Sequence, residues 1–275
     1  MRKRRTLELT ASYLVALVAI LLTLFPIYWI LNIALKTQRE AFAIPPHWIF
    51  TPIWDNFEKV FNNVAYRTAF ANTVIVTALG VAIAIVLAIL CAYALNRFRF
   101  RGRELFAGWL LLAYMLPEFL YVIPMYALYQ QIGLYDTHIG LALVYQVHSL
   151  PFAIWMLRSF FQEVPRELDD SARVDGCTYW GILWRIYIPV TRPGIAATAI
   201  LTAIWIWNEL TIALALSFSN AGTITVAVAS FRGYAAVRWG EMAAASILAI
   251  LPMLIFAIFA QKYIVSGLTL GSVKG

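Results

Sequence analysis

Long apolar stretches alternate with short polar segments along the chain. Six of these stretches are long enough to cross about 30 Å of hydrocarbon, which takes roughly 20 helical residues. They lack the alternating pattern of barrel strands, and a backbone in lipid must satisfy its own hydrogen bonds, so each is predicted to be a helix. The predicted spans are residues 11–35, 70–95, 105–130, 139–160, 194–217 and 242–265.

Prolines inside these spans predict kinks or interruptions, because proline lacks the amide that a helix needs for its hydrogen bonds. A packed bundle tolerates such breaks, since neighbouring groups bind the freed carbonyls. These prolines are Pro26, Pro117, Pro124, Pro151 and Pro252.

The composition agrees with a membrane protein. Of the 275 residues, 62% are hydrophobic and 13% are charged, which is more apolar surface than a soluble domain of this length can hide. The N-terminal MRKRR precedes an apolar run that continues to Leu35 without an evident cleavage site, so an uncleaved first span is predicted rather than a signal peptide. Cys91 and Cys177 are interpreted as ordinary small residues, not as a disulfide or a metal site.

The basic residues set the predicted orientation. With the N-terminus inside, 15 of the 21 Lys and Arg residues fall in cytoplasmic segments and six in external ones. This bias predicts that both termini are cytoplasmic. It also accounts for the formal net charge of +7 without a nucleic-acid partner.

The longest predicted cytoplasmic connection, residues 161–193, carries a charged helix with signals at both ends. Pro165 suits the first turn of a helix, and the acidic residues after it suit the positive end of the helix dipole. Gly176 suits the left-handed position that ends such a helix. A capped helix in a solvated loop explains these features as well as a binding element does. Two ion pairs at i,i+4 spacing are expected, Arg166 with Asp170 and Asp169 with Arg173.

The helix sequence ELDDSARVDG resembles the EAA loop of ABC-importer permeases. Asp170, Ser171 and Ala172 stand at the Glu-Ala-Ala positions, Gly176 stands at the glycine of the motif, and Ile-Pro at 188–189 matches its closing Leu-Pro. Asp replaces Glu and Ser replaces the first Ala, which keeps an acidic group and a small surface.

The resemblance covers about residues 10–275 and is densest from Asn72 onward. It is to carbohydrate-importer permeases of the maltose-permease second-subunit type. The matching segments are AYALNRFRFRG (92–102), MLPEFLYVIPMYALYQQIGLYDT (115–137), LPFAIWMLRSFFQEVPRELDDSARVDG (150–176), WNE (207–209) and GLTLGSVKG (267–275).

This resemblance implies an all-α polytopic membrane protein with six transmembrane helices and the type I ABC-importer permease fold, in a prokaryotic cell membrane. It implies a heterodimer with a second permease subunit, two cytoplasmic ATPase subunits, an extracytoplasmic sugar-binding protein and a carbohydrate substrate. The chain has no G-x-x-x-x-G-K-[ST] segment, so ATP and Mg are expected on the partner ATPase. No cofactor, metal or catalytic residue is expected on this chain, which would be a transport subunit and not an enzyme.

In that family the EAA helix docks in a cleft on the ATPase. By analogy Asp170 would meet a basic ATPase group, Ser171 and Ala172 would allow close packing, and Gly176 would set the turn to the next helix. The expected ATPase-coupling residues are Glu167, Asp169, Asp170, Ser171, Ala172, Arg173, Asp175 and Gly176.

The expected organisation has three parts. The external loop 36–69 should form an interfacial loop and a short amphipathic helix, and the external loop 218–240 occupies the place of one that contacts the binding protein in the maltose-type system. The C-terminal tail resembles one that reaches between the ATPase subunits there. The parts are residues 1–69 (N-terminal cytoplasmic tail, first transmembrane helix and external loop), 70–265 (transmembrane core with the coupling loop 161–193) and 266–275 (cytoplasmic C-terminal tail).

Polar residues at membrane depth are candidates for the translocation path. Asn208 and Glu209 could offer hydrogen bonds to sugar hydroxyls beside the face of Trp205, and Glu118 lies in a proline-bounded stretch that suits an external gate. The alternatives are hydrogen bonds between helices and, for Glu118, an interfacial position. His148 is interpreted as a packing residue.

Two other classes of membrane protein predict different sequence features. An ion-coupled secondary transporter predicts coupled buried carboxylates and an internal inverted repeat, and the chain offers few such groups and no evident repeat. A membrane-embedded enzyme would need a nucleophile motif or a set of metal ligands, and neither is present in the sequence.

Overall fold

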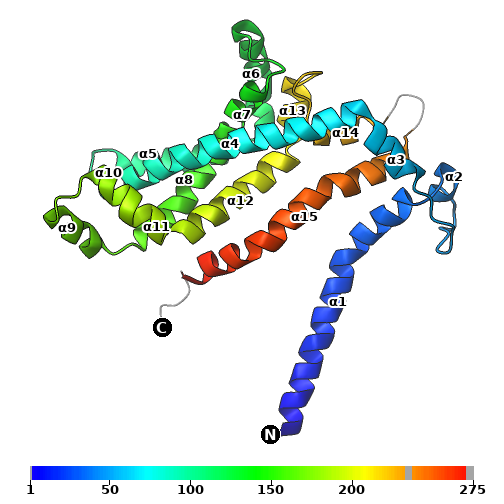
Figure 1. Ribbon diagram of the computed structural model, residues 1–275, viewed down its shortest axis with the longest axis horizontal. Coiled ribbons are helices and arrows are strands. Elements are labelled where there is room, and N and C mark those ends of the chain that lie inside the picture. The colour runs from blue at the N-terminus through cyan, green and yellow to red at the C-terminus, as the bar shows by residue number, and fades with distance from the viewer. Residues whose placement is uncertain (1, 233–236, 271–275) are drawn as a thin grey trace. The chain divides into compact units, whose positions relative to one another are not determined.

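The computed structural model describes residues 2–232 and 237–270 and consists of helices joined by short connections (Figure 1). Within those ranges, extended pairing is limited to an isolated bridge between Arg232 and Val237, so the predicted all-α fold is confirmed. Residues 233–236 of the predicted external loop and residues 271–275 of the predicted tail lie outside the described residues.

Three helices are by themselves long and apolar enough to cross a membrane, and three bent pairs of helices raise that number to as many as six. The single helices are α1 (Arg2–Ala34), α4 (Val64–Arg97) and α15 (Trp239–Leu270). The bent pairs are α5 (Arg103–Tyr114) with α6 (Glu118–Ile132) at 90°, α7 (His138–Val144) with α8 (Gln146–Gln162) at 51°, and α10 (Tyr179–Ile182), η1 (Leu183–Tyr187) and α11 (Ile188–Val190) with α12 (Arg192–Asn208) at 77°.

An interruption at a proline is confirmed at Pro117, which lies at the break between α5 and α6. Pro26, Pro124, Pro151 and Pro252 lie inside continuous helices.

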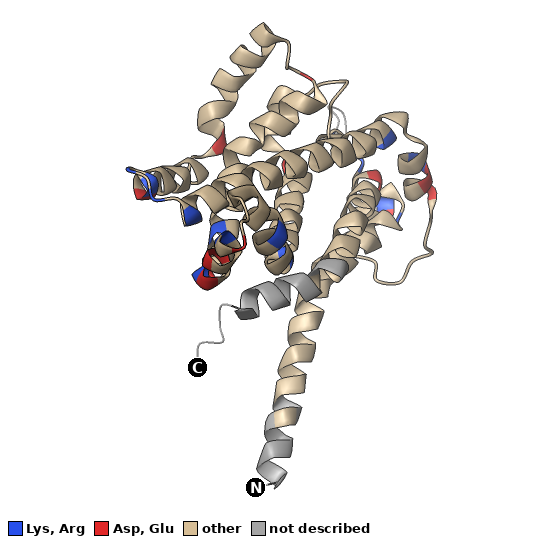
Figure 2. Cartoon of the chain, turned by 60° about the vertical axis from the view of Figure 1, so that its left-hand side comes forward, with Lys and Arg blue, Asp and Glu red and all other residues tan. Residues whose placement is uncertain are grey.

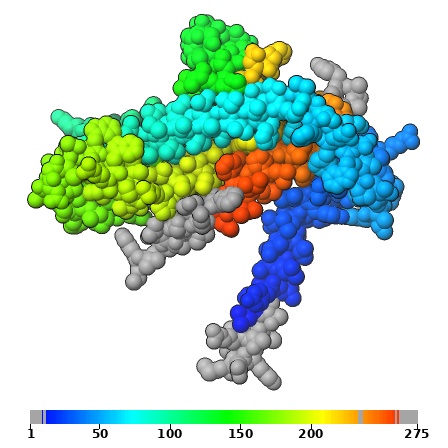
Figure 3. Space-filling view, viewed as in Figure 1, coloured from blue at the N-terminus to red at the C-terminus, as the bar shows by residue number. Residues whose placement is uncertain are grey.

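The predicted single span over 194–217 is wrong, because the helix is interrupted after Asn208. A second helix, α13 (Thr211–Leu216), follows two residues later and packs against α6. The green α6 and the yellow α13 lie side by side in Figure 3.

The chain divides into two compact units. One holds the residues up to Arg67 and Ala227–Leu251. In this unit the loop after α1 is folded and carries α2 (Gln38–Ala41) and the predicted short amphipathic helix, α3 (Asp55–Asn62). The Asn56 amide donates to the carbonyls of Ala34 and Lys36, which fixes α3 to the end of α1.

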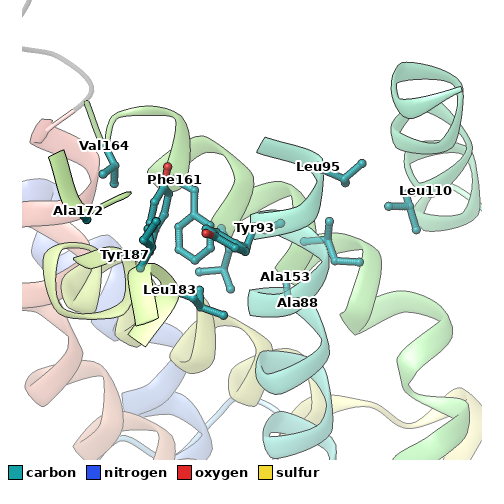
Figure 4. Packing of buried hydrophobic residues seen from close by; sticks show 14 residues of the cluster. Ala88, Tyr93, Leu95, Leu110, Ala153, Phe161, Val164, Ala172, Leu183 and Tyr187 are labelled. Atoms are coloured by element: carbon teal, nitrogen blue, oxygen red, sulfur yellow. The ribbon is translucent and has the colours of Figure 1, made fainter. Parts of the chain in front are cut away.

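The other unit holds Thr68–Val226 and the residues from Pro252 onward. Here α8 packs against α5 and α12. The remaining elements are α9 (Arg166–Val174), in the connection after α8, and α14 (Ile224–Ala229), whose first residues belong to this unit. Buried aromatic and aliphatic side chains from α4, α8 and η1 form its largest core cluster, part of which is shown in Figure 4.

Charged residues gather at helix ends and in connections, whereas the long helices are nearly free of them (Figure 2). This distribution keeps ionised groups out of hydrocarbon, where each would cost several kcal/mol. Ionised side chains are therefore concentrated on the short helices and connections outside the spans, above all on α9.

Candidate functional site

The two ends of α9 are fixed by local geometry. Pro165 is its N-cap residue, one position before the predicted first turn. At the other end the Gly176 amide donates to the Arg173 carbonyl, and the Cys177 amide donates to the Ala172 carbonyl. These two bonds form a Schellman motif, and Gly176 has a φ of +81°. The predicted left-handed helix stop is confirmed.

The buried face of α9 carries a charge. Asp169 is 0% exposed, and its carboxylate forms an ion pair with Arg97 at the C-terminal end of α4. The Tyr187 hydroxyl donates to Oδ2 of Asp169 over 3.0 Å, and Oδ1 has no hydrogen-bond partner in the part of the chain that the structure describes. Because removing Arg97 would leave the buried Asp169 charge uncompensated, its loss would cost about 3–5 kcal/mol.

The expected i,i+4 ion pairs on α9 are not formed. Asp169 points toward α4, and the Arg173 guanidinium lies over the ring of Tyr179, 5.2 Å from its centroid, in a cation–π contact. Among the described residues no ion pair joins Arg166 to Asp170. The sequence pattern found the charged side chains but not their partners, because those lie on other elements.

Ala172 also faces inward. It is buried in the cluster that contains Phe161, Val164 and Tyr187 (Figure 4). Its small side chain therefore allows α9 to approach the core of its own chain. Ser171, the other small residue of the motif, is exposed.

The opposite face of α9 is open. Val174 is 88% exposed, so an apolar side chain stands on the surface of this charged helix. It lies one turn after Asp170 and Ser171 on the same helix face, and sequence reasoning missed it. The other expected coupling residues on the exposed surface are Glu167, Arg173, Asp175 and Gly176.

Glu209 is buried and interacts with the backbone. Its two carboxylate oxygens accept hydrogen bonds from the amides of Ile212 and Ala213, the otherwise free donors in the first turn of α13. Its own carbonyl accepts from the Thr225 hydroxyl. This arrangement matches the alternative interpretation, in which the polar group holds helices together.

The other translocation candidates are spread over several environments. The Asn208 amide donates back to the Ile204 carbonyl on an exposed surface, and Glu118 is partly exposed at the start of α6. The Trp205 ring stacks on His148 with centroids 4.2 Å apart and meets the edge of Tyr145. His148 is thus a packing residue, as the sequence indicated.

A second residue that sequence reasoning missed is Asp136, in the connection between α6 and α7. Its carboxylate accepts hydrogen bonds from four consecutive backbone amides, those of residues 218–221. Burial raises the pKa of Asp136, but these hydrogen bonds outweigh burial and hold its pKa below the ordinary value. Asp136 thereby fixes the segment after α13, within which Phe218 is 79% exposed.

The described residues contain no group of three or more His, Cys, Asp or Glu side chains arranged to hold a metal ion. Cys91 and Cys177 are both free thiols and half-buried.

Comparison with known proteins gives one consistent result. Residues 84–270 match the family described as binding-protein-dependent transport system inner membrane component. The chain is similar to the trehalose transport system permease protein SugB of Mycobacterium tuberculosis, with 36% identity over 258 residues, 92% of this chain and 93% of the relative. It is also similar to the trehalose/maltose transport system permease protein MalG of Thermococcus litoralis, with 30% identity over 276 residues, 99% of this chain and 98% of the relative.

The fold is similar to that of a chain in the crystal structure of a bacterial ABC transporter involved in the import of the acidic polysaccharide alginate. The TM-score is 0.76 at 23% identity, with 96% of this chain and 98% of that chain covered. The predicted permease fold is therefore confirmed over nearly the whole length of both chains.

Proposed function

The chain belongs to the family of inner membrane components of binding-protein-dependent transport systems, and we propose that it is the permease subunit of an ATP-driven sugar importer. It is a multi-pass protein of the cell membrane. The sugar class rests on the relatives, whose names carry trehalose and maltose. The family match gives no support to the alternative of an ion-coupled secondary transporter.

The proposed assembly contains this chain, a second permease subunit, two ATPase subunits and an extracytoplasmic sugar-binding protein. This chain and the second permease would each form half of the translocation pathway, with both termini of this chain in the cytoplasm. ATP and Mg would bind to the ATPase subunits, because this chain lacks a P-loop.

The observation that carries the proposal is the two-sided construction of α9. Its buried face is held by Asp169 and Ala172, and its exposed face presents Asp170, Ser171 and Val174. A short helix with capped ends and a buried face held by packing transmits a displacement as a rigid element, whereas a flexible loop would absorb it. We infer that the exposed face meets the ATPase and that closure of the ATPase pair moves the membrane helices through α9.

Uptake into vesicles tests the transport class. In vesicles that hold the assembled complex, labelled trehalose or maltose should enter only when ATP and the binding protein are both supplied. An uncoupler should leave this uptake unchanged while ATP persists. Uptake that the uncoupler abolishes in the presence of ATP would contradict the proposal.

A charge reversal on α9 tests the coupling role. Asp170→Lys should lower uptake per ATP hydrolysed, or disassemble the complex, because it places a cation against the basic ATPase group expected there. The matched control is Glu163→Lys, which changes an exposed acidic residue at the end of α8, off the helix. Normal uptake and normal ATPase stimulation in Asp170→Lys would show that α9 does not meet the ATPase through this face.

A further inference from the structure

The C-terminal end of α4 and the buried face of α9 meet at the ion pair between Arg97 and Asp169. We propose that Arg97 is a positioning residue that fixes α9 to α4, so that a displacement of α9 reaches the membrane-spanning helices through α4. This inference rests on the proposed coupling role of α9 and adds the residue that carries the displacement onward.

The ion pair is shielded from water on both sides. The side chain of Arg97 is 11% exposed and that of Asp169 is 0% exposed. Two charges in such an environment are costly to separate, since each would be left buried alone. A shift of α9 relative to α4 therefore meets a steep rise in energy, while a joint movement of both helices leaves the pair intact.

Tyr187 is the second attachment of the same carboxylate. Its hydroxyl donates to Asp169, and its ring packs edge-on against the rings of Tyr93 of α4 and Phe161 of α8, with centroids 5.0 and 5.2 Å away (Figure 4). The aromatic ring is thus fixed by packing while its polar end holds α9.

Local backbone geometry places Tyr187 at this point. It ends η1, a π-helical turn in which the Ile188 amide donates to the Leu183 carbonyl, five residues back. Pro189 follows and has no amide to continue an ordinary helix. Such π-helical turns are rare and occur frequently at functional sites.

Two further hydrogen bonds attach the last turns of α4 to the segments that flank α9. The Asn96 amide donates to the Phe161 carbonyl over 2.7 Å, and the Tyr93 hydroxyl donates to the Tyr179 carbonyl over 3.1 Å. The end of α4 therefore holds the chain before α9, α9 itself and the chain after it. A contiguous network of packed and hydrogen-bonded groups therefore joins α9 to α4, and such a network can pass a displacement of one helix to the other.

The test uses the complete transporter in proteoliposomes, with uptake and ATP hydrolysis measured on the same preparation. Arg97→Gln keeps much of the side chain but loses its charge, and should lower sugar uptake per ATP by about tenfold in an assembled complex. Arg99→Gln is the matched control: Arg99 lies two residues further on, is exposed, and forms none of the ion pairs among the described residues. Its uptake per ATP should equal that of the wild type.

The outcomes separate this inference from the proposed function. If Asp170→Lys uncouples the transporter but Arg97→Gln has wild-type uptake per ATP, the inference about Arg97 is wrong and the coupling role of α9 stands. If neither variant changes uptake per ATP, both are wrong. Where Arg97→Gln does not assemble, Asp169→Asn decides, since it breaks the same ion pair while its amide oxygen can still accept the Tyr187 hydroxyl. That variant should also lower uptake per ATP about tenfold, and an unchanged ratio would overturn the inference.

Discussion

Asp169 and Asp170 are neighbours in the chain, yet their carboxylates lie in opposite environments. Successive residues of a helix are about 100° apart, so one of the pair faces the core when the other approaches the surface. Asp169 is buried against Arg97, and Asp170 is exposed. A motif that gives both positions an acidic residue therefore combines an internal anchor with an external contact.

Neutralising these two residues should have unequal effects on stability. Asp169→Asn leaves the buried guanidinium of Arg97 without its partner charge and should destabilise the protein by about 3 kcal/mol. Asp170→Asn removes an exposed charge and should change stability by less than about 0.5 kcal/mol. Thermal unfolding of the purified complex in detergent measures both, and equal shifts would contradict the assignment of the buried face.

Gly176 offers a substitution that tests backbone conformation alone. A Cβ at this position would meet no atom within 4 Å, so Gly176→Ala should cost about 1–2 kcal/mol only through its positive φ. Gly108→Ala, at an equally open position inside α5 without a positive φ, is the control and should not destabilise. Thermal unfolding compares the two variants.

Gly176→Val places a β-branched residue at the same positive φ and should also lower uptake per ATP. Wild-type transport in Gly176→Val would count against the role of the helix stop.

Asp136 should make the stability of the folded protein decrease at low pH. Its pKa is lowered in the folded protein, because the hydrogen bonds from residues 218–221 outweigh burial. It therefore contributes stability that is complete above the ordinary aspartate pKa of about 3.9 and is lost as the pH falls through the lower folded value.

The variant Asp136→Asn isolates this contribution. At neutral pH it should be less stable than the wild type by roughly 2 kcal/mol, since hydrogen bonds to a charged acceptor are lost. The difference in unfolding temperature between the two proteins should shrink as the pH falls below about 4. A difference that stays constant down to pH 3 would show that the Asp136 charge does not hold the 218–221 segment.

At the scale of elements, the break between α12 and α13 is held by Glu209. Glu209→Ala should destabilise the protein by about 2 kcal/mol, because it leaves the buried amides of Ile212 and Ala213 without acceptors. Glu209→Gln keeps one acceptor oxygen and should cost less. Thermal unfolding and the KM for sugar are measured together. A raised KM at unchanged stability would instead place Glu209 in the translocation path.

The sequence predicted the ends of α9 correctly but not its two faces. Pro165 and Gly176 act on backbone within a few residues of themselves, so their signals can be read locally. The partner of Asp169 is Arg97, on a helix far away in the chain, and no spacing rule reaches that far. The same limit explains why the sequence assigned Asp169 to an ion pair with Arg173.

The boundaries of the helices also divide into those that the sequence predicted and those that only the folded chain shows. The apolar periodicity located the spans, because burial in lipid constrains long runs of residues. It missed the interruption at Glu209, since only the folded chain shows that this carboxylate caps a new helix. Proline was a poor guide to interruptions, because the helices continue through Pro26, Pro151 and Pro252.

At the scale of the whole molecule, the chain combines membrane-spanning helices with one charged helix fixed at the end of α4. The family match covers residues 84–270, which include α9 and the core that holds it. In the proposed transporter, the ATPase displaces α9 through contacts with its exposed face. The ion pair of Arg97 with Asp169 passes this displacement to α4, and Asp136 keeps the 218–221 segment in place.

Crosslinking from the exposed face of α9 tests this account most directly. In a chain with Cys91 and Cys177 replaced by Ser, Val174→Cys labelled with a thiol-reactive benzophenone should crosslink to an ATPase subunit of the assembled complex on illumination, since the excited ketone inserts into a C–H bond and needs no second thiol. Phe218→Cys, equally accessible but expected on the external side, should form none. A crosslink from Val174→Cys alone is the result expected. An assembled, ATP-hydrolysing complex in which Val174→Cys never crosslinks to the ATPase would contradict the central claim.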